Sequence, residues 1–240
     1  MKLIIVRHAE PDYSIDSLTE KGFIEAELLS ERLSKLDIDA FYCSPLGRAQ
    51  DTSKPTLKKM NRVAQTLPWL REFLGNSIEA DGTESYAWDR LPGVWTQYPE
   101  HYDPNNWYNS PLYKNSNVKE HYDTVAKGVD ELLEKHGYKK EGGFYRAVNP
   151  NTDTIVLFCH FAVECVILSH IWNISPMVLW HGTVALPSSV TTLITEERVE
   201  GEAYFRMNGF ADLSHLYAAD HPASFAARFC EVYSDFSQRH

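Results

Sequence analysis

The stretch KLIIVRHAE, residues 2–10, decides how this chain folds. Its first half, Lys2–Val6, is almost continuously apolar and rich in β-branched residues, which is typical of a strand buried on both faces of a sheet. Arg7 and His8 follow directly, at the carboxyl end of the expected strand. An arginine beside a histidine is an unusual ending for a buried strand, and it indicates a functional site.

Two further groups of polar residues follow expected strands. Thr154–Cys159 is the most strand-like run of the chain and leads into His160, and Ser44–Arg48 follows a strand expected at Ala40–Cys43. In open α/β sheets, ligand sites lie outside the carboxyl ends of the strands. We therefore expect two arginines and two histidines to meet in one pocket. Charge-assisted hydrogen bonds from arginine contribute roughly 1.5–3 kcal/mol each, so this pocket is suited to phosphoryl transfer.

The remaining elements alternate between strands and helices. Ser17-Leu18-Thr19-Glu20 reads as a capping box, with Thr19 as an alternative N-cap, before a helix whose apolar residues are Phe23, Ala26, Leu29 and Leu33. Further helices are expected from Ser44-Pro45 and over Val118–His136 and Ala162–Trp172, and further strands over Val63–Leu67, Ser189–Thr195 and Ala203–Met207. This order predicts an α/β protein, a three-layer α/β/α sandwich with a mainly parallel sheet, in one domain spanning residues 1–240.

Residues 75–117 differ in character from the rest of the chain. They contain Trp88, Trp95 and Trp107 together with several prolines, tyrosines and asparagines, and they are too aromatic for a disordered linker. We expect an irregular insertion or cap within the domain, with Trp88 and Trp95 lining the mouth of the pocket. The alternative is a segment that packs against the body and has no role toward a ligand.

Composition restricts the possible partners. The chain has 240 residues, 43% hydrophobic and 23% charged, and a net charge of −10, which argues against nucleic-acid and anionic-membrane surfaces. Four cysteines without a CxxC pair suggest neither a disulfide scaffold nor a zinc site. The N-terminal apolar run is too short for a signal peptide, and no run suffices for a membrane span. We expect a soluble cytoplasmic protein, and its oligomeric state stays open.

The motifs, taken in order, resemble the histidine phosphatase superfamily, the phosphoglycerate mutase-like enzymes. Arg7-His8-Ala9-Glu10 resembles the Arg-His-Gly-Glu motif of that family, and Ser44–Thr52 matches its Ser-Pro-x-x-Arg-Ala-x-x-Thr in full. The segment Val156–His160 resembles the late strand that ends in His-Gly, with Phe161 in place of glycine. Three further stretches are similar to family segments: Leu18–Gly22, Leu186–Thr195 and Ser214-His215-Leu216.

The resemblance implies a role for each residue of the pocket. His8 would be the nucleophile that becomes phosphorylated, and Arg7, Arg48 and His160 would hold the phosphoryl oxygens, with Ser14 as a further candidate for substrate binding. A nucleophilic imidazole must be neutral, and neighbouring arginines lower its pKa below the free value of about 6.5. Because protein cations supply the positive charge, we expect no metal ion and no cofactor.

A carboxyl must protonate the leaving oxygen. In the family it lies after the second helix in a Leu-x-Glu context, which Leu70-Arg71-Glu72-Phe73 fits, so Glu72 is the expected general acid. Glu84 and Asp81 are the runners-up. The expected function is metal-independent hydrolysis of small-molecule phosphomonoesters through a phosphohistidine on His8.

Three other interpretations fit the sequence less well. Cys43 to Arg48 is one residue short of the Cys-x5-Arg loop of cysteine phosphatases and contains Pro45. A mutase is disfavoured because Phe73-Leu74-Gly75 follows Glu72, where mutases have Arg-His-Tyr-Gly. A non-catalytic protein that binds phosphorylated ligands is a third possibility, which the presence of all four pocket residues disfavours. His181 is expected to be structural.

Overall fold

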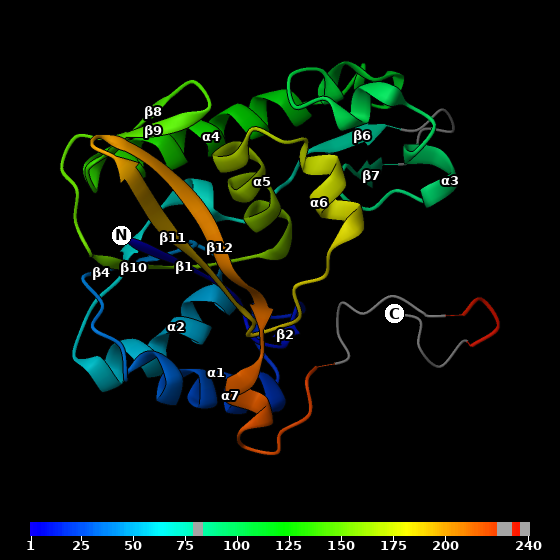
Figure 1. Ribbon diagram of the computed structural model, residues 1–240. Coiled ribbons are helices and arrows are strands. Elements are labelled where there is room, and N and C mark those ends of the chain that lie inside the picture. Colours follow the sequence, from blue (N-terminus) through cyan, green and yellow to red (C-terminus); the bar gives the residue numbers. More distant parts are fainter. Residues whose placement is uncertain (79–83, 225–231, 236–240) are drawn as a thin grey trace.

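The computed structural model describes residues 1–78, 84–224 and 232–235 of the chain. Helical layers cover both faces of a central sheet (Figure 1), which confirms the predicted α/β/α class. The strands are β1 Lys2–Arg7, β2 Pro11–Asp12, β3 Ser17–Leu18, β4 Ala40–Cys43, β5 Gln65–Thr66, β6 Asn76–Ile78, β7 Glu84–Tyr86, β8 Tyr138–Glu141, β9 Phe144–Ala147, β10 Thr154–Cys159, β11 Val190–Val199 and β12 Glu202–Asp212. The α-helices are α1 Glu20–Leu33, α2 Gly47–Met60, α3 Pro92–Trp95, α4 Val118–Lys135, α5 Phe161–Trp172, α6 Pro176–Gly182 and α7 Ser214–Tyr217, and the 3-10 helices are η1 Pro68–Leu70, η2 Pro99–Tyr102, η3 Trp107–Asn109 and η4 Pro111–Tyr113.

The main sheet has the strand order β5-β4-β10-β1-β11-β12-β9-β8. The half made of β5, β4, β10 and β1 is parallel, and the strands from β11 onward pair antiparallel. The hairpin β8–β9 was not predicted from the sequence. The predicted strands over Ser189–Thr195 and Ala203–Met207 belong to the longer β11 and β12, whereas Val63–Leu67 contains only the two residues of β5. The parallel half therefore brings the ends of β4, β10 and β1 side by side.

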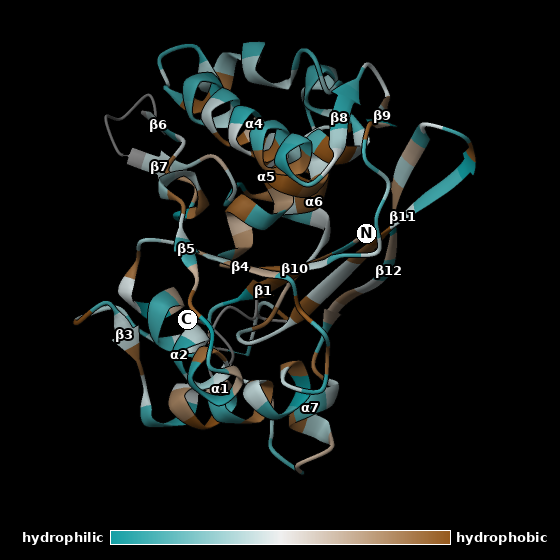
Figure 2. Ribbon diagram, turned by 90° about the vertical axis from the view of Figure 1, so that its left-hand side faces the viewer, coloured by the Kyte–Doolittle hydropathy of each residue, from teal (hydrophilic) through white to brown (hydrophobic). Residues whose placement is uncertain are grey.

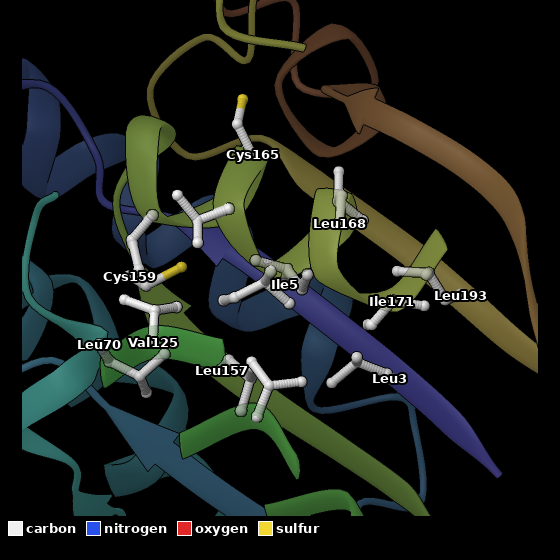
Figure 3. Close-up of a cluster of buried hydrophobic side chains, with 14 of the residues drawn as sticks. Leu3, Ile5, Leu70, Val125, Leu157, Cys159, Cys165, Leu168, Ile171 and Leu193 are labelled. Atoms are coloured by element: carbon white, nitrogen blue, oxygen red, sulfur yellow. The ribbon is translucent and has the colours of Figure 1, made fainter. Parts of the chain in front are cut away.

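Alternating side chains of β1 divide the core into two parts. Leu3 and Ile5 pack with residues of α4, α5 and α6, whereas Ile4 and Val6 pack with Leu29 of α1 and Ala49 of α2. Figure 3 shows the first of these cores, where Leu3 and Ile5 lie among the side chains of α5 and β10. Figure 2 shows the sheet between its two helical layers. The prediction that β1 is buried on both faces is confirmed.

Helix α1 begins differently from its predicted capping box. Thr19, the alternative N-cap, is the observed one, and its hydroxyl accepts the Gly22 N–H at 3.0 Å. Ser17 is not a cap because its hydroxyl donates to Asp51. Phe23, expected on the apolar face, is 46% exposed, because the buried face turns Gly22 and Glu25 toward Glu10 instead.

Helix α2 begins at Gly47 rather than at Ser44-Pro45. The Ser44 hydroxyl accepts the Leu46 N–H at 3.2 Å and lies 2.7 Å from His160 Nε2. Ser44 therefore binds a residue of a neighbouring strand end and does not cap the helix. A Cβ on Gly47 would lie 2.1 Å from the Asp16 carbonyl oxygen. The helix therefore starts at a glycine, because only a residue without a Cβ lets the Asp16 backbone lie this close to the first turn of α2.

The described part of the aromatic-rich segment 75–117 lies on the side of the sheet that carries α4, α5 and α6 (Figure 1). It consists mainly of short elements, as its composition predicts. Trp107 is fully buried and its ring is 5.5 Å from that of Trp180 in α6, so this part of the segment belongs to the core. Its description as an insertion or cap within a single domain stays a prediction.

Within the described ranges, no helix combines the length and the apolar character needed to cross a membrane.

Candidate active site

The three groups of polar residues expected to converge do lie together. His8 follows β1, Ser44 follows β4 and His160 follows β10, and these strands are neighbours in the parallel half of the sheet. The ring centroids of His8 and His160 are 5.0 Å apart, although the residues are far apart in the sequence. Both side chains are almost completely buried. The topology thus builds one histidine-containing site at the carboxyl ends of the strands.

The His8 ring is held in one tautomer. Its Nδ1 lies 2.8 Å from the carbonyl oxygen of Ala9. A carbonyl only accepts hydrogen bonds, so Nδ1 carries the hydrogen and Nε2 keeps its lone pair in the neutral ring. Burial, together with the positive charges of Arg7 and Arg48, holds the pKa of His8 well below its ordinary value. The ring is therefore neutral at neutral pH, with a nucleophilic nitrogen.

His160 is oriented by Ser44. The Ser44 hydroxyl lies 2.7 Å from His160 Nε2, while the same oxygen accepts the Leu46 N–H. When the Ser44 hydroxyl donates its hydrogen to Nε2, the hydrogen of a neutral His160 ring lies on Nδ1. Among the described residues, Nδ1 has no hydrogen-bond partner. Burial, with the charges around it, keeps the pKa of His160 well below its ordinary value. His160 can thus donate from Nδ1 to a ligand oxygen.

Arg7 is buried on the α5 side of the sheet. Its Nη1 donates to the carbonyl oxygen of Ala185, and its Cζ lies 5.7 Å from the centre of the Phe161 ring. Within the described part of the chain its Nε has no hydrogen-bond partner. A buried guanidinium with an unused donor is well suited to binding an anion.

Arg48 is held by two residues of the loop between β2 and β3, Tyr13 and Asp16. Its Nη1 donates to Asp16 Oδ1 at 2.6 Å, and Tyr13 packs on its guanidinium with 5.3 Å between Cζ and the ring centre. The other Asp16 oxygen accepts the Gly47 N–H at 2.7 Å. Asp16 is partly buried, which opposes its ionisation, but these hydrogen bonds and the Arg48 charge lower its pKa. One carboxylate therefore fixes both the start of α2 and the direction of Arg48.

Glu72, the predicted general acid, lies beside the start of α5. Its Oε1 accepts the N–H groups of Phe73 at 2.9 Å and Val163 at 3.2 Å. Burial raises the pKa of Glu72, although these hydrogen bonds and the charges of Arg7 and Arg48 oppose the shift. The runner-up Asp81 lies outside the described residues, and so does the side chain of Glu84.

Ser14 is not part of this arrangement. It is exposed, and its hydroxyl donates to Asp12 Oδ1 at 2.5 Å. Its expected role in substrate binding stays a prediction without a supporting contact.

Three residues support His8 in ways that the sequence did not reveal. The Thr52 hydroxyl accepts the Ala9 N–H at 2.9 Å and donates to the Arg48 carbonyl at 2.7 Å, so it ties the loop after His8 to α2. The Ser188 N–H donates to the His8 carbonyl at 3.0 Å, and the Ser188 hydroxyl lies 3.2 Å from His215 Nε2. All three residues lie in segments noted in the sequence, Ser44–Thr52, Leu186–Thr195 and Ser214-His215-Leu216, which is the signal that could have found them.

The other polar candidates have different surroundings. Burial raises the pKa of the Cys43 thiol to about 12, so a reactive thiolate is not available there. His181 has structural contacts: its Nε2 accepts the Arg90 N–H at 3.1 Å, and its ring stacks on Trp95. Trp88 donates from Nε1 to the Phe73 carbonyl at 3.2 Å, one residue from Glu72. In the described residues, no group of three or more His, Cys, Asp and Glu side chains could hold a metal ion.

Comparisons with known proteins identify the relatives of this chain. The profile of the histidine phosphatase superfamily (branch 1) matches residues 3–205. A Schizosaccharomyces pombe protein described as a probable phosphatase is 37% identical over 228 residues, which covers 90% of this chain and 95% of that protein. A 2,3-bisphosphoglycerate-dependent phosphoglycerate mutase of Methanosarcina acetivorans is 31% identical over 147 residues, and the match spans only 56% of each chain.

Solved structures show the same fold. The phosphoserine phosphatase of Entamoeba histolytica in complex with phosphoserine has a TM-score of 0.59 at 17% identity, covering 90% of this chain and 98% of that one. A mycobacterial glucosyl-3-phosphoglycerate phosphatase has a TM-score of 0.58 at 17% identity, covering 88% and 98%. At these identities the likeness concerns the fold alone.

Proposed function

Because the chain belongs to the histidine phosphatase superfamily, we propose that it hydrolyses phosphomonoesters through a phosphohistidine formed on His8. The observation that carries this proposal is the state of the His8 ring. Its hydrogen is held on Nδ1 by the Ala9 carbonyl, and burial and two guanidinium groups keep it neutral. Nε2 is then a nucleophile beside His160, in a site that supplies positive charge for a phosphoryl group.

In the first half of the reaction, His8 Nε2 forms a bond to phosphorus and the bond from phosphorus to the ester oxygen breaks. Glu72 gives its proton to the departing oxygen, so that an alcohol leaves. Arg7, Arg48 and the Nδ1–H of His160 stabilise the charge on the three remaining phosphoryl oxygens. The raised pKa of Glu72 supports this role, because a protonated carboxyl is needed at this step.

In the second half, a water molecule replaces His8 on phosphorus. Glu72, now ionised, accepts a proton from that water, and the bond between phosphorus and Nε2 breaks. Inorganic phosphate leaves, and His8 and Glu72 return to their starting states. The same carboxyl thus serves both half-reactions, as acid and then as base.

Small phosphorylated molecules are the proposed substrates. The names of the structural relatives, a phosphoserine phosphatase and a glucosyl-3-phosphoglycerate phosphatase, support this class. Trp88 is the residue that we propose to contact the leaving group. Its indole N–H donates to the carbonyl of Phe73, the residue after Glu72, and this hydrogen bond fixes the ring. The proposed role of Trp95 at the same place is weaker, since its ring stacks on His181.

A mutase is the second candidate, favoured by the partial match to the Methanosarcina acetivorans enzyme. A mutase would pass the phosphoryl group from His8 to a second hydroxyl instead of to water. Incubation with 3-phosphoglycerate and 2,3-bisphosphoglycerate, followed by analysis of the products, separates the two functions. We expect inorganic phosphate, and formation of 2-phosphoglycerate without phosphate release would favour the mutase.

The proposed phosphatase activity is tested by comparing the wild type with His8→Ala. Release of inorganic phosphate is measured on a panel of phosphate esters, including an aryl phosphate, in the presence of EDTA. We expect release of phosphate by the wild type and a loss of at least about 1000-fold in the variant. Equal rates in both proteins would remove His8 from the reaction. Binding of phosphate esters without turnover in either protein would favour the non-catalytic alternative.

A further inference from the structure

Glu164 is a buried carboxyl that the proposed reaction does not use. It lies in the first turn of α5 and is 1% exposed. Its Oε1 has no hydrogen-bond partner among the residues that the structure describes. Burying a carboxyl without full pairing costs free energy, so its position calls for an explanation.

Three contacts of Glu164 and its neighbours on α5 connect this part of the helix with β11 and with the proposed catalytic groups. Phe161 and Glu164 are three residues apart on α5 and therefore share one face of the helix, and Arg7 packs on the Phe161 ring at 5.7 Å. The N–H of Val163, the residue before Glu164, donates to Glu72 Oε1 at 3.2 Å. On the strand side, Thr191 of β11 pairs with Ile5 of β1 and hydrogen-bonds the Glu164 side chain.

The charges around Glu164 are unbalanced. The positive charge of Arg7, on β1, favours the ionised form of Glu164, and the negative charge of Glu72, in the loop after η1, opposes it. The Cys159 thiol of β10 and the Cys165 thiol of α5 stay neutral, because burial raises the pKa of both well above the ordinary value. Burial raises the pKa of Glu164 to about 7, while the hydrogen bond from Thr191 and the charge of Arg7 oppose this shift. Glu164 therefore changes charge near neutral pH.

We propose that Glu164 is a positioning residue that acts through Arg7 and sets how much positive charge the site presents to a phosphoryl group. Neutral Glu164 leaves the Arg7 charge available to the ligand. Ionised Glu164 pairs with Arg7 and adds a negative charge close to the bound anion. By linkage, an anion in the site favours the protonated form of Glu164, and protonation strengthens anion binding to the same degree.

Sulfate is a suitable probe because it remains a dianion across the pH range of interest, so that only protein groups titrate. Calorimetry on the full chain would give the Kd for sulfate between about pH 5.5 and 8.5, for the wild type and Glu164→Gln. We expect equal Kd values at the acid end. At the alkaline end we expect the wild type to bind about fivefold to tenfold more weakly than Glu164→Gln, as is typical of coupled sites.

A second variant and a matched control make the result specific. Glu164→Met removes the charge and the hydrogen-bonding capacity together and should bind sulfate as Glu164→Gln does. Glu131→Gln removes an exposed carboxyl of α4 that forms an ion pair with Lys127, and it should follow the wild type. The same ratio of Kd values at every pH, in both Glu164 variants, would overturn the proposal.

The inference rests on the proposed phosphoryl site, and the experiment separates the two. A lack of sulfate binding by the wild type at every pH would overturn the site and the inference together. Sulfate binding with a pH-independent ratio would overturn the role of Glu164 alone and leave the proposed function standing.

Discussion

Burial and the neighbouring positive charges both lower the pKa of His8. Removal from water disfavours the imidazolium, and Arg7 and Arg48 repel it further. The Ala9 carbonyl then selects the tautomer with a free Nε2. The proposed nucleophile is thus held neutral and in one tautomer by the surrounding residues of the protein itself, which is the arrangement that electrostatic preorganisation requires.

Glu72→Gln tests the general acid. Alkyl phosphates have poor leaving groups that need a proton, whereas aryl phosphates have good ones, so we expect kcat to fall about 100-fold or more on the former and much less on the latter. Rates for one alkyl and one aryl ester, in the wild type and the variant, give this comparison. The raised pKa of Glu72 also predicts that the wild type loses activity on alkyl esters as pH rises through that pKa, because the acid ionises.

Glu84→Gln and Asp81→Asn are the controls for this substitution. These substitutions remove the runner-up carboxyls, and neither should change the ratio of alkyl to aryl rates. A larger loss on alkyl esters in either of them than in Glu72→Gln would transfer the role to that residue.

At the scale of elements, loops and helix starts build the site from distant parts of the chain. The start of α2 is bound by Asp16, from the loop before α1, through the Gly47 N–H and the Arg48 guanidinium. Thr52, one and a half turns into α2, reaches back to the loop after β1. The motif Ser44–Thr52 is therefore a structural unit as well as a source of Arg48.

Thr52→Val tests this connection. The substitution keeps the shape but leaves the Ala9 N–H without its acceptor, so we expect a loss of about 1–3 kcal/mol in the free energy of unfolding. We also expect a lower kcat/KM, because the His8 loop is released. Denaturant unfolding and steady-state rates measure the two effects.

Thr56→Val provides the matched control on the same helix. Thr56 is as buried as Thr52, but its hydroxyl has no hydrogen-bond partner within the described part of the chain. The variant should keep its activity and lose no stability. Similar effects of the two substitutions would show that the connection through Thr52 has no importance.

Several elements could be predicted from the sequence because their signals are local. The apolar runs of β1 and β10 and the periodicity of α4 need no distant partner. At α1 the alternative N-cap Thr19 is confirmed, whereas Ser17 as the first N-cap choice and Ser44-Pro45 as the start of α2 were wrong, because Ser17 and Ser44 hydrogen-bond to residues far along the chain. The convergence of the two histidines followed from strand order, whereas the contacts of Thr52, Ser188 and Glu164 depend on tertiary neighbours that no local pattern encodes.

At the scale of the whole molecule, a chain with a net charge of −10 places Arg7 and Arg48 together beside the carboxyl ends of its parallel strands. The same fold buries carboxyls in both helical layers, Glu25 in α1 and Glu164 in α5. Burial raises the pKa of each to about 7. Folding stability must therefore depend on pH through these groups.

Glu25→Gln tests this dependence. The folded state holds the Glu25 proton more tightly than the unfolded state, so stability is fully present below the ordinary pKa of 4.5 and falls as pH rises toward about 7. The difference corresponds to roughly 3 kcal/mol, an upper estimate for one carboxyl. Glutamine keeps an acceptor for the Glu10 N–H without the charge.

We expect the variant to unfold at a Tm about 5 °C or more above that of the wild type near pH 8, with little difference near pH 4.5. Thermal unfolding monitored by circular dichroism at both pH values provides the measurement. A lower Tm of the variant at pH 8 would mean that the ionised carboxylate stabilises the fold, contrary to its raised pKa.

A phosphoryl group on His8 is the intermediate on which the proposed function depends, and rapid-quench mass spectrometry detects it most directly. The enzyme is mixed with an aryl phosphate, quenched in base and digested. We predict one added phosphoryl group on the peptide that contains His8, stable in base and lost in acid, and absent from His8→Ala. A phosphorylated peptide without His8, or an unchanged phosphoenzyme in His8→Ala, would contradict the assignment of His8 as the nucleophile.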